Sequence, residues 1–318
     1  MAHMITEEES LAVVNKPAWH GLGKALDYAP SSEAMIEEAG LSWEVKVEPL
    51  YSADMADTGY RGIFRQDTRR CLGTVKGRYV PVQNRDMFTA LDSLLSDGIL
   101  KYESAGSIKA GETVWALARV PSLTADIVPG DTISSYVLAT GDHNGKGAVS
   151  FLYTALRLVC GNGLTMALNT AKSITRVCHS GDVEAKMSEA MDLLANANNA
   201  FNSYVDRAKR LTEHRLEVRR LAEAVFPAKE DDTRASTRRN NILDAIDSIS
   251  KRHTNTVGGI GGTAWSAVNA ITEYIEHEST AKSTQFSESE NRFHSNMFGA
   301  KLALKHKAYR LAEAMVGV

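Results

Sequence analysis

The chain has 318 residues, of which 43% are hydrophobic and 24% charged, and its formal net charge is −3. This balance is that of an ordinary folded protein, and it excludes a histone-like chain that binds nucleic acid through its total charge. Its apolar stretches are too short to cross a bilayer, and residues 1–10 lack the features of a signal peptide. We therefore expect a soluble protein with no membrane partner.

The three cysteines, Cys71, Cys160 and Cys178, are widely spaced and form no Cys-x-x-Cys pair. This pattern favours a reducing compartment, no disulfide framework and no structural zinc site. No nucleotide-binding or hydrolase motif is present, so we expect no cofactor.

The first half of the chain predicts short strands separated by helices. A capped helix is expected over 31–39, and the alternation from Leu41 to Val47 predicts a half-buried strand. Apolar residues at helical spacing predict a helix over 84–96, with Asn84 as a plausible cap. Further strands are expected over 60–64, 72–75 and 113–120, the last ended by Pro121.

Two β-prone runs, 133–140 and 148–153, flank a glycine-rich loop. Asn144-Gly145 within this loop is a strong hairpin signal, because both residues tolerate positive φ. The loop is longer than two residues, so we expect a projecting, mobile tip. The tip residues predicted to make contacts are Asp142, His143, Asn144 and Lys146.

From residue 182 an alternating three-and-four spacing of apolar residues predicts a long helix over 182–226, or a helical hairpin. A charged loop is expected over 228–239, and further helices over 240–250, 263–278 and 296–315. We therefore predict an α+β fold. Residues 1–180 form a domain with a mixed or antiparallel sheet, short helices and the projecting hairpin, and 181–318 form a mainly helical region.

The most informative local composition is in residues 60–85, where seven basic side chains face the single acid Asp67. Basic groups bind phosphates and aromatic faces stack unpaired bases, so the segment is a candidate interface for single-stranded nucleic acid. The alternative is a set of solvated strand faces with Phe64 and Tyr79 in the core. The predicted phosphate contacts are Arg61, Arg65, Arg69, Arg70, Lys76, Arg78 and Arg157, and Tyr79 is predicted to stack on a base.

Several strings of the sequence together resemble one family. They are residues 16–23 (KPAWHGLG), 39–43 (AGLSW), 72–84, 102–106, 114–119, 154–162 (TALRLVCGN) and 263–274 (TAWSAVNAITEY). In this order they resemble the phage/plasmid-like protein family, a domain-of-unknown-function family of bacteriophages and plasmids. The resemblance implies a mobile-element protein that acts in the host bacterial cytoplasm, and it implies no established activity.

Three hypotheses follow. The first is a single-stranded DNA-binding protein of the annealing (recombination) type that acts as a homo-oligomer, by analogy with strand–hairpin–helix annealing proteins. It requires the arginines to converge into one cationic trough that is not neutralised by carboxylates. The second is a protein-interaction module, such as a counter-defence factor that binds a host protein. The third is an enzyme with an unrecognised site around His20, Glu103, His143 and Arg157.

Overall fold

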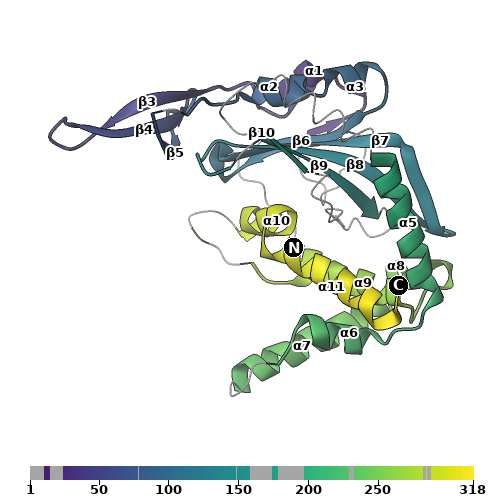
Figure 1. Cartoon of the computed structure of the whole chain (residues 1–318). Helices are drawn as coiled ribbons and strands as arrows, with labels where there is room; N and C mark the ends of the chain where they lie inside the picture. Colours follow the sequence, from purple (N-terminus) through teal and green to yellow (C-terminus); the bar gives the residue numbers. More distant parts are fainter. Residues whose placement is uncertain are drawn as a thin grey trace. The chain divides into compact units, whose positions relative to one another are not determined.

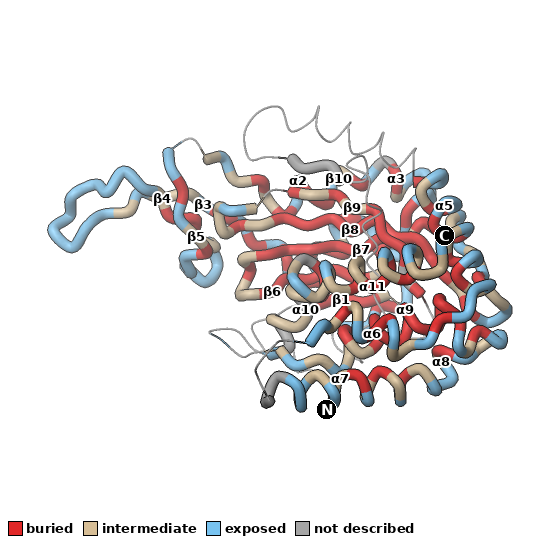
Figure 2. Tube along the Cα trace, turned by 60° about the horizontal axis from the view of Figure 1, so that its bottom comes forward, coloured by how far each residue is buried: buried red, intermediate tan, exposed pale blue. Residues whose placement is uncertain are grey.

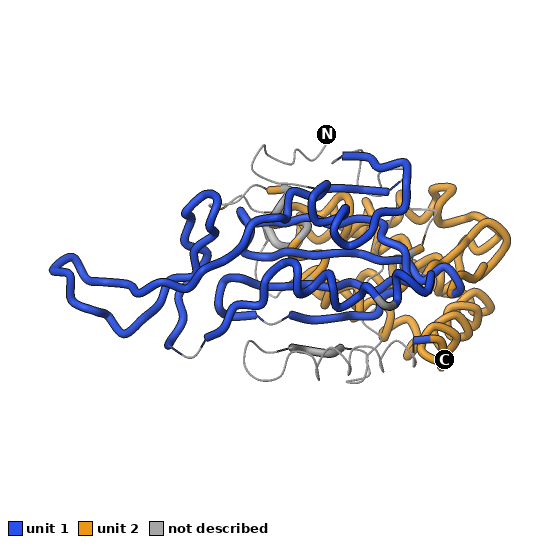
Figure 3. The backbone as a smooth tube through the Cα atoms, turned by 90° about the horizontal axis from the view of Figure 1, so that it is seen from above, with its two compact units in different colours: residues 1–122, 135–154, 169–197 blue, residues 123–134, 155–168, 198–318 orange. Residues whose placement is uncertain are grey.

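The computed structural model describes residues 11–14, 24–77, 79–147, 149–157, 174–177, 197–228, 233–281, 284 and 288–318. Two sheets occupy the first half of the chain and helices the second (Figure 1), which confirms the predicted α+β fold. Two compact units divide the chain (Figure 3). Unit 1 comprises residues 1–122, 135–154 and 169–197, and unit 2 comprises 123–134, 155–168 and 198–318.

The larger sheet is mixed and has seven strands in the order β10-β9-β8-β7-β6-β1-β2. β1 and β2 are parallel, whereas β1–β6, β6–β7 and β9–β10 are antiparallel. The strands are β1 (Leu11–Val14), β2 (Lys24–Leu26), β6 (Lys101–Ile108), β7 (Thr113–Val128), β8 (Asp131–Asp142), β9 (Val149–Arg157) and β10 (Ile174–Val177). β7 continues past Pro121, contrary to prediction, because the fixed φ of proline is compatible with an extended backbone.

Three short helices belong to unit 1: α1 (Ser32–Glu38), α2 (Asn84–Thr89) and α3 (Asp92–Ser96). α1 begins as predicted, with the Ser31 hydroxyl accepting from the amide of Ala34 at 3.3 Å. The helix predicted over 84–96 is divided between α2 and α3. The cap of α2 is Gln83 rather than Asn84. Phe88 of α2 packs on Tyr102 of β6, with 5.6 Å between the ring centroids.

The smaller sheet is antiparallel, in the order β3 (Val45–Tyr51), β4 (Asp57–Arg65) and β5 (Cys71–Lys76). The β3–β4 hairpin reaches away from the rest of unit 1, and every residue from 51 to 60 is exposed (Figure 2). We call residues 50–60 the arm tip. The projecting hairpin of unit 1 is therefore β3–β4.

The alternation of apolar and polar residues from Leu41 to Val47 reflects alternate burial, but only its last part, from Val45, belongs to a strand. Leu41, Trp43 and Val45 are buried in turn, as the pattern indicates. Residues 41–44 precede β3 and are not part of a strand. Instead, the Asn84 amide nitrogen donates to the carbonyls of Leu41 (2.9 Å) and Trp43 (3.1 Å).

Unit 2 contains the long helical segment, which is not one helix to residue 226. Residues 182–196 lie outside the described residues, and the rest is divided into α5 (Ala197–Glu213) and α6 (Val218–Val225). Arg215, a charged residue between α5 and α6, forms a β-bridge with Thr263 at the break. The amide of Leu216 also donates to the carbonyl of Gly262 at 3.2 Å.

The core of unit 2 is built around α9 (Ala264–Glu273), in which every residue is buried. Thr263 caps it, and a π-helical turn, Tyr274–Glu278, extends it. The remaining helices are α7 (Thr233–Ser250), α8 (His253–Thr256), α10 (Glu288–Phe298) and α11 (Ala300–Val316), with a 3₁₀ turn at Val257–Gly259. α7 thus begins within the predicted loop over 228–239. Across the described ranges, no helix has the length and apolar character needed to span a membrane.

Candidate functional site

The predicted nucleic-acid contacts on the smaller sheet are divided between its two faces. Arg61 and Arg65 lie four residues apart on β4 and therefore share a face. Tyr60 and Lys76, which pair across β4 and β5, lie on the other face. The basic side chains of β4 and β5 therefore do not all lie on one face.

Neighbouring carboxylates pair with the arginines. Arg61 lies 3.4 Å from Asp57, and Arg69 donates to both oxygens of Glu48 at 3.0 Å. The hydrogen bond from Arg69, followed by its charge, lowers the pKa of the Glu48 carboxyl. Arg69 also lies over the Phe64 ring, 5.7 Å from the centroid, so it covers the aromatic face that a base would need.

Arg65 makes its contacts with other residues of unit 1. It donates to both oxygens of Asp67 at 2.8 and 2.9 Å and to the Ala110 carbonyl at 3.2 Å. Its guanidinium carbon lies 4.4 Å from the centroid of the Trp43 ring. These contacts fix β4 against the 3₁₀ turn Lys109–Gly111 and occupy the donors that a phosphate would bind.

The apparent charge of the basic segment follows from where the sequence window begins. Residues 60–85 contain one acid, but residues 44–76, which form the sheet, contain six basic side chains and five carboxylates. Antiparallel pairing of β3 with β4 brings Glu48 beside the segment. The sheet is therefore nearly neutral.

The remaining basic-segment residues have different environments. Arg70 is exposed in the β4–β5 turn, Lys76 is exposed at the end of β5, and Arg78 lies outside the described residues. Tyr79 is partly buried, and burial, helped by the charge of Asp142, raises the pKa of its hydroxyl to about 12. Its ring is thus not a fully open stacking platform.

Arg157, which was predicted to contact phosphate, has a completely buried side chain. It forms a bidentate ion pair with Asp131, and its Nη2 donates to the Thr254 carbonyl at 2.7 Å. All three residues belong to unit 2. Its role is internal to that unit.

The β8–β9 hairpin forms as predicted, but its tip packs on β5 instead of projecting. A Cβ on Gly73 of β5 would lie 2.2 Å from the carbonyl oxygen of Asn144, and a Cβ on Gly145 would lie 2.5 Å from Val75. Backbone therefore meets backbone, which only glycine permits here. The Lys146 side chain remains exposed, and its amide donates to the Asn144 side chain at 2.8 Å.

Asp142 and His143 have internal partners. The Thr113 hydroxyl donates to Asp142 at 2.6 Å. His143 is 2% exposed, and its Nε2 lies 2.8 Å from the Asn84 side-chain oxygen. Because the Asn84 nitrogen donates to two carbonyls, this oxygen is the acceptor and Nε2 carries the proton. The predicted contact of this hairpin tip with a nucleic-acid strand or with a neighbouring subunit stays a prediction.

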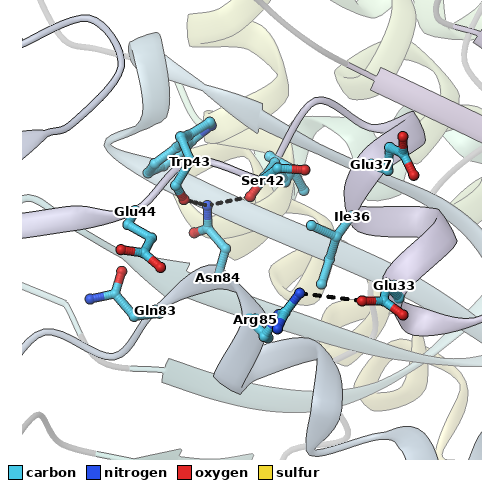
Figure 4. Close-up of a pocket in the computed structure, with 10 residues that line it drawn as sticks. Glu33, Ile36, Glu37, Ser42, Trp43, Glu44, Gln83, Asn84 and Arg85 are labelled. Carbon is cyan, nitrogen blue, oxygen red and sulfur yellow. Dashed lines mark hydrogen bonds and ion pairs between the residues drawn. The ribbon is translucent and has the colours of Figure 1, made fainter.

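A pocket of about 380 Å³ opens between α1, residues 41–44 and the start of α2 (Figure 4). Glu33, Glu37 and Glu44 line it against the single cation Arg85, which pairs with Glu33 at 3.3 Å. The other lining residues are Ile36, Leu41, Ser42, Trp43, Gln83 and Asn84. Three carboxylates against one guanidinium disfavour a phosphate ligand.

The residues of the predicted enzyme alternative have separate partners. Glu103 lies 3.9 Å from Arg119, and burial raises the pKa of its carboxyl. His143 contacts Asn84, Arg157 contacts Asp131, and His20 lies outside the described residues. Within the part of the chain that the structure covers, no group of three or more His, Cys, Asp or Glu residues is arranged to hold a metal ion.

Comparison with protein families matches residues 71–297 to the family described as domain of unknown function (DUF932). The chain belongs to this family. Comparisons with curated proteins and with solved structures found no match.

The DUF932 match covers β5 to α10 and includes the buried Arg157–Asp131 pair. Two of the strings that carry the family resemblance, 154–162 and 263–274, meet at this pair. Arg157 belongs to the first, and Trp265 of the second donates from Nε1 to Asp131 at 2.8 Å. The arm tip precedes the matched residues, so DUF932 membership carries no information about it.

The sequence analysis did not identify the arm tip as a candidate site. Tyr51 (54% exposed), Met55 (75%) and Tyr60 (46%) are three of the six large apolar side chains that are exposed among the described residues. Residues 51–55 (Tyr-Ser-Ala-Asp-Met) alternate apolar and polar side chains, which is the pattern of a half-buried strand, so no local signal marked their apolar side chains as exposed.

Proposed function

We propose that this DUF932 protein is a protein-interaction module of a phage- or plasmid-borne element, and that its arm tip binds a host protein. The mobile-element origin is supported by the family resemblance of its sequence strings, and action in the host cytoplasm follows from that origin. Covalent chemistry is not needed for this role.

The observation that carries the proposal is the concentration of exposed apolar side chains on a projecting hairpin. Single exposed apolar residues are common on soluble proteins, whereas a cluster marks an interaction site. Tyr51, Met55 and Tyr60 fall within ten consecutive residues. Tyrosine and methionine are also enriched in protein–protein interfaces.

The charge arrangement supports a protein partner over a nucleic acid. Binding to single strands depends on basic groups that follow the phosphates along a groove. Here Arg61, Arg65 and Arg69 each pair with a carboxylate, and Arg157 is buried. Four of the seven predicted phosphate contacts therefore have carboxylate partners within the protein, and the annealing hypothesis stays a prediction.

Affinity capture from nuclease-treated bacterial lysate tests the proposal. The bait is the full chain, and the matched control is a variant in which residues 51–59 are replaced by Asn-Gly. This two-residue turn leaves Leu50 opposite Tyr60, as the pairing of Pro49 with Arg61 requires. Circular dichroism and thermal unfolding establish that both proteins are folded.

We expect mass spectrometry to identify a protein that the full chain retains and the short-arm variant loses. That protein, once purified, should bind the full chain in isolation. Recovery of the same proteins by both baits would contradict the proposal. Capture that nuclease treatment abolishes would instead support the nucleic-acid hypothesis.

A further inference from the structure

The turn at the end of the arm is held by its own hydrogen bonds. The Ser52 amide donates to the Ala56 carbonyl at 2.8 Å, and the Met55 amide donates to the Ser52 carbonyl at 2.9 Å. The Ala56 amide donates to the Ser52 hydroxyl at 3.2 Å. The tip is therefore ordered before any partner binds, which lowers the entropic cost of binding.

Met55 occupies this turn in a conformation that favours glycine. Its φ is 61°, in the left-handed region where a Cβ is strained, and its side chain is 75% exposed. This conformation belongs to the tight hairpin turn that is closed by the Met55–Ser52 and Ser52–Ala56 backbone hydrogen bonds. Glycine is the usual residue in this conformation, and methionine instead presents an apolar side chain at the outermost turn.

The ionisable groups of the arm tip, apart from its tyrosines, are the carboxylates Asp54 and Asp57. Arg61, just beyond the tip, pairs with Asp57, and Asp57 also accepts from the Gly59 amide at 2.8 Å. Polyanions are repelled by such a tip, and proteins that wedge apolar side chains into DNA carry basic groups beside them. A partner with basic side chains is attracted.

Addition of a partner strand along β3 is disfavoured by two features of its outer edge. The Gln66 amide donates to the Glu44 carbonyl, so the pair Val45–Arg65 turns the amide and carbonyl of Val45 outward. The Gln83 side chain binds both of these groups. Pro49, four residues further along β3 and also directed to the outer edge, has no amide hydrogen to offer. Recognition therefore depends on the side chains of the tip.

We propose, on the basis of the proposed function, that the arm tip inserts Tyr51, Met55 and Tyr60 into an apolar groove of the partner protein, and that lysine or arginine side chains on the groove's rim face Asp54 and Asp57. Buried aromatic and methionine side chains supply most of the affinity, and the rim charges set the association rate and its salt dependence.

The probe is the protein captured by the full chain and then purified, and its Kd is measured at low and high salt. Met55→Gly should weaken binding about tenfold, as expected of a central contact, while the thermal midpoint stays the same or rises because the strain is removed. Asp54→Lys should weaken binding more at low than at high salt. Tyr28→Ala and Asp97→Lys, which change exposed residues elsewhere in unit 1, should leave Kd within about twofold.

The outcomes separate this inference from the proposed function. Loss of binding in the short-arm variant, with Met55→Gly and Asp54→Lys unchanged, overturns the inference and leaves the proposed function standing. Absence of any arm-dependent protein overturns both. A doubled mass in light scattering that Met55→Gly returns to the monomer identifies a second copy of this chain as the occupant and overturns the proposed partner chemistry.

Discussion

Arg157 and Asp131 form an ion pair in which neither side chain is exposed, with Arg157 Nη2 at 2.9 Å from Asp131 Oδ2. The same carboxylate oxygen accepts from Trp265 Nε1 at 2.8 Å. Arg157 Nη2 also donates to the carbonyl of Thr254, whose hydroxyl donates to Glu273 at 3.0 Å. This network joins the end of β9 to α8 and α9 within unit 2.

Removal of one partner leaves a buried charge, so we expect Arg157→Met to lower the free energy of unfolding by about 3–5 kcal/mol. The double variant Asp131→Asn/Arg157→Met should be more stable than Arg157→Met alone, because a neutral amide still accepts from Trp265. Urea unfolding of the full chain measures both. Arg61→Met, which breaks an exposed pair, should cost at most about 1 kcal/mol. Equal decreases in the free energy of unfolding for Arg157→Met and Arg61→Met would contradict the expectation that the buried pair contributes more to stability than the exposed one.

The sequence predicts those elements whose signals are local. The helix α1 within residues 31–39, the β8–β9 hairpin at Asn144-Gly145 and the helix α9 within residues 263–278 were all correctly placed. The burial of Arg157 could not be predicted from a local signal. Arginine is normally solvated, and the partner that permits its burial, Asp131, lies 26 residues earlier.

The candidate site depended on strand register, which the two-residue period does not supply. Register decides that Glu48 stands beside Arg69, and it converts a basic window into a nearly neutral sheet. The period also predicts a strand at Leu41–Val47 without indicating that side chains of the Gln83-Asn84 pair satisfy its backbone. Exposure of Met55 has no sequence pattern of its own.

The contact of the β8–β9 tip with β5 predicts different effects on stability for alanine substitutions at Gly73 and Gly77. Gly73→Ala places a Cβ against the backbone of Asn144 and should destabilise the protein by about 1–3 kcal/mol, the range for overpacking. Gly77→Ala meets nothing within 4 Å and should change stability by less than about 0.5 kcal/mol. Thermal unfolding compares them, and a neutral Gly73→Ala would mean that the tip does not pack on β5 in solution.

The Gln83 side chain acts in place of a strand at the edge of β3. Its oxygen accepts from the Val45 amide at 3.0 Å, and its nitrogen donates to the Val45 carbonyl at 3.1 Å. Gln83→Ala should therefore lower the free energy of unfolding by about 1–3 kcal/mol, since it leaves two part-buried backbone groups without partners. Gln66→Ala, at an exposed turn position, is the matched control and should be neutral. Indistinguishable urea midpoints for the two variants would contradict this role.

Lys301 gives unit 2 a specific pH dependence. Burial, together with the nearby charge of Arg292, lowers the pKa of its ammonium group from 10.5 to about 8. The unfolded chain therefore binds more protons than the folded one between pH 8 and 10.5, and stability rises with pH across that window. Below pH 8 Lys301 is charged in both the folded and the unfolded chain, and the full free-energy cost of burying its ammonium group lowers the stability.

Lys301→Gln removes this cost and should raise the free energy of unfolding at pH 7 by about 1 kcal/mol, after allowance for solvent screening. The difference between this variant and the unmodified chain should shrink from pH 8 to pH 10. Urea unfolding at four pH values measures it, with Lys251→Gln, at an exposed lysine, as the control. A difference that is constant with pH would exclude Lys301 as its source.

Oligonucleotide binding tests the annealing hypothesis directly. Because Arg69 is paired with Glu48 and Arg65 with Asp67, we expect a labelled single-stranded oligonucleotide to bind with a non-specific Kd of roughly 10⁻⁴–10⁻⁶ M at physiological salt. Charge reversal at Arg69, Arg70 and Arg78 should then change the Kd by less than about threefold, and Glu48→Gln, which releases Arg69, should tighten binding slightly. Fluorescence anisotropy at 50 and 200 mM salt measures all three proteins. A nanomolar Kd that weakens steeply with salt and is abolished by the triple reversal would instead establish nucleic-acid binding, because it would mean that phosphates displace these carboxylates from their arginines.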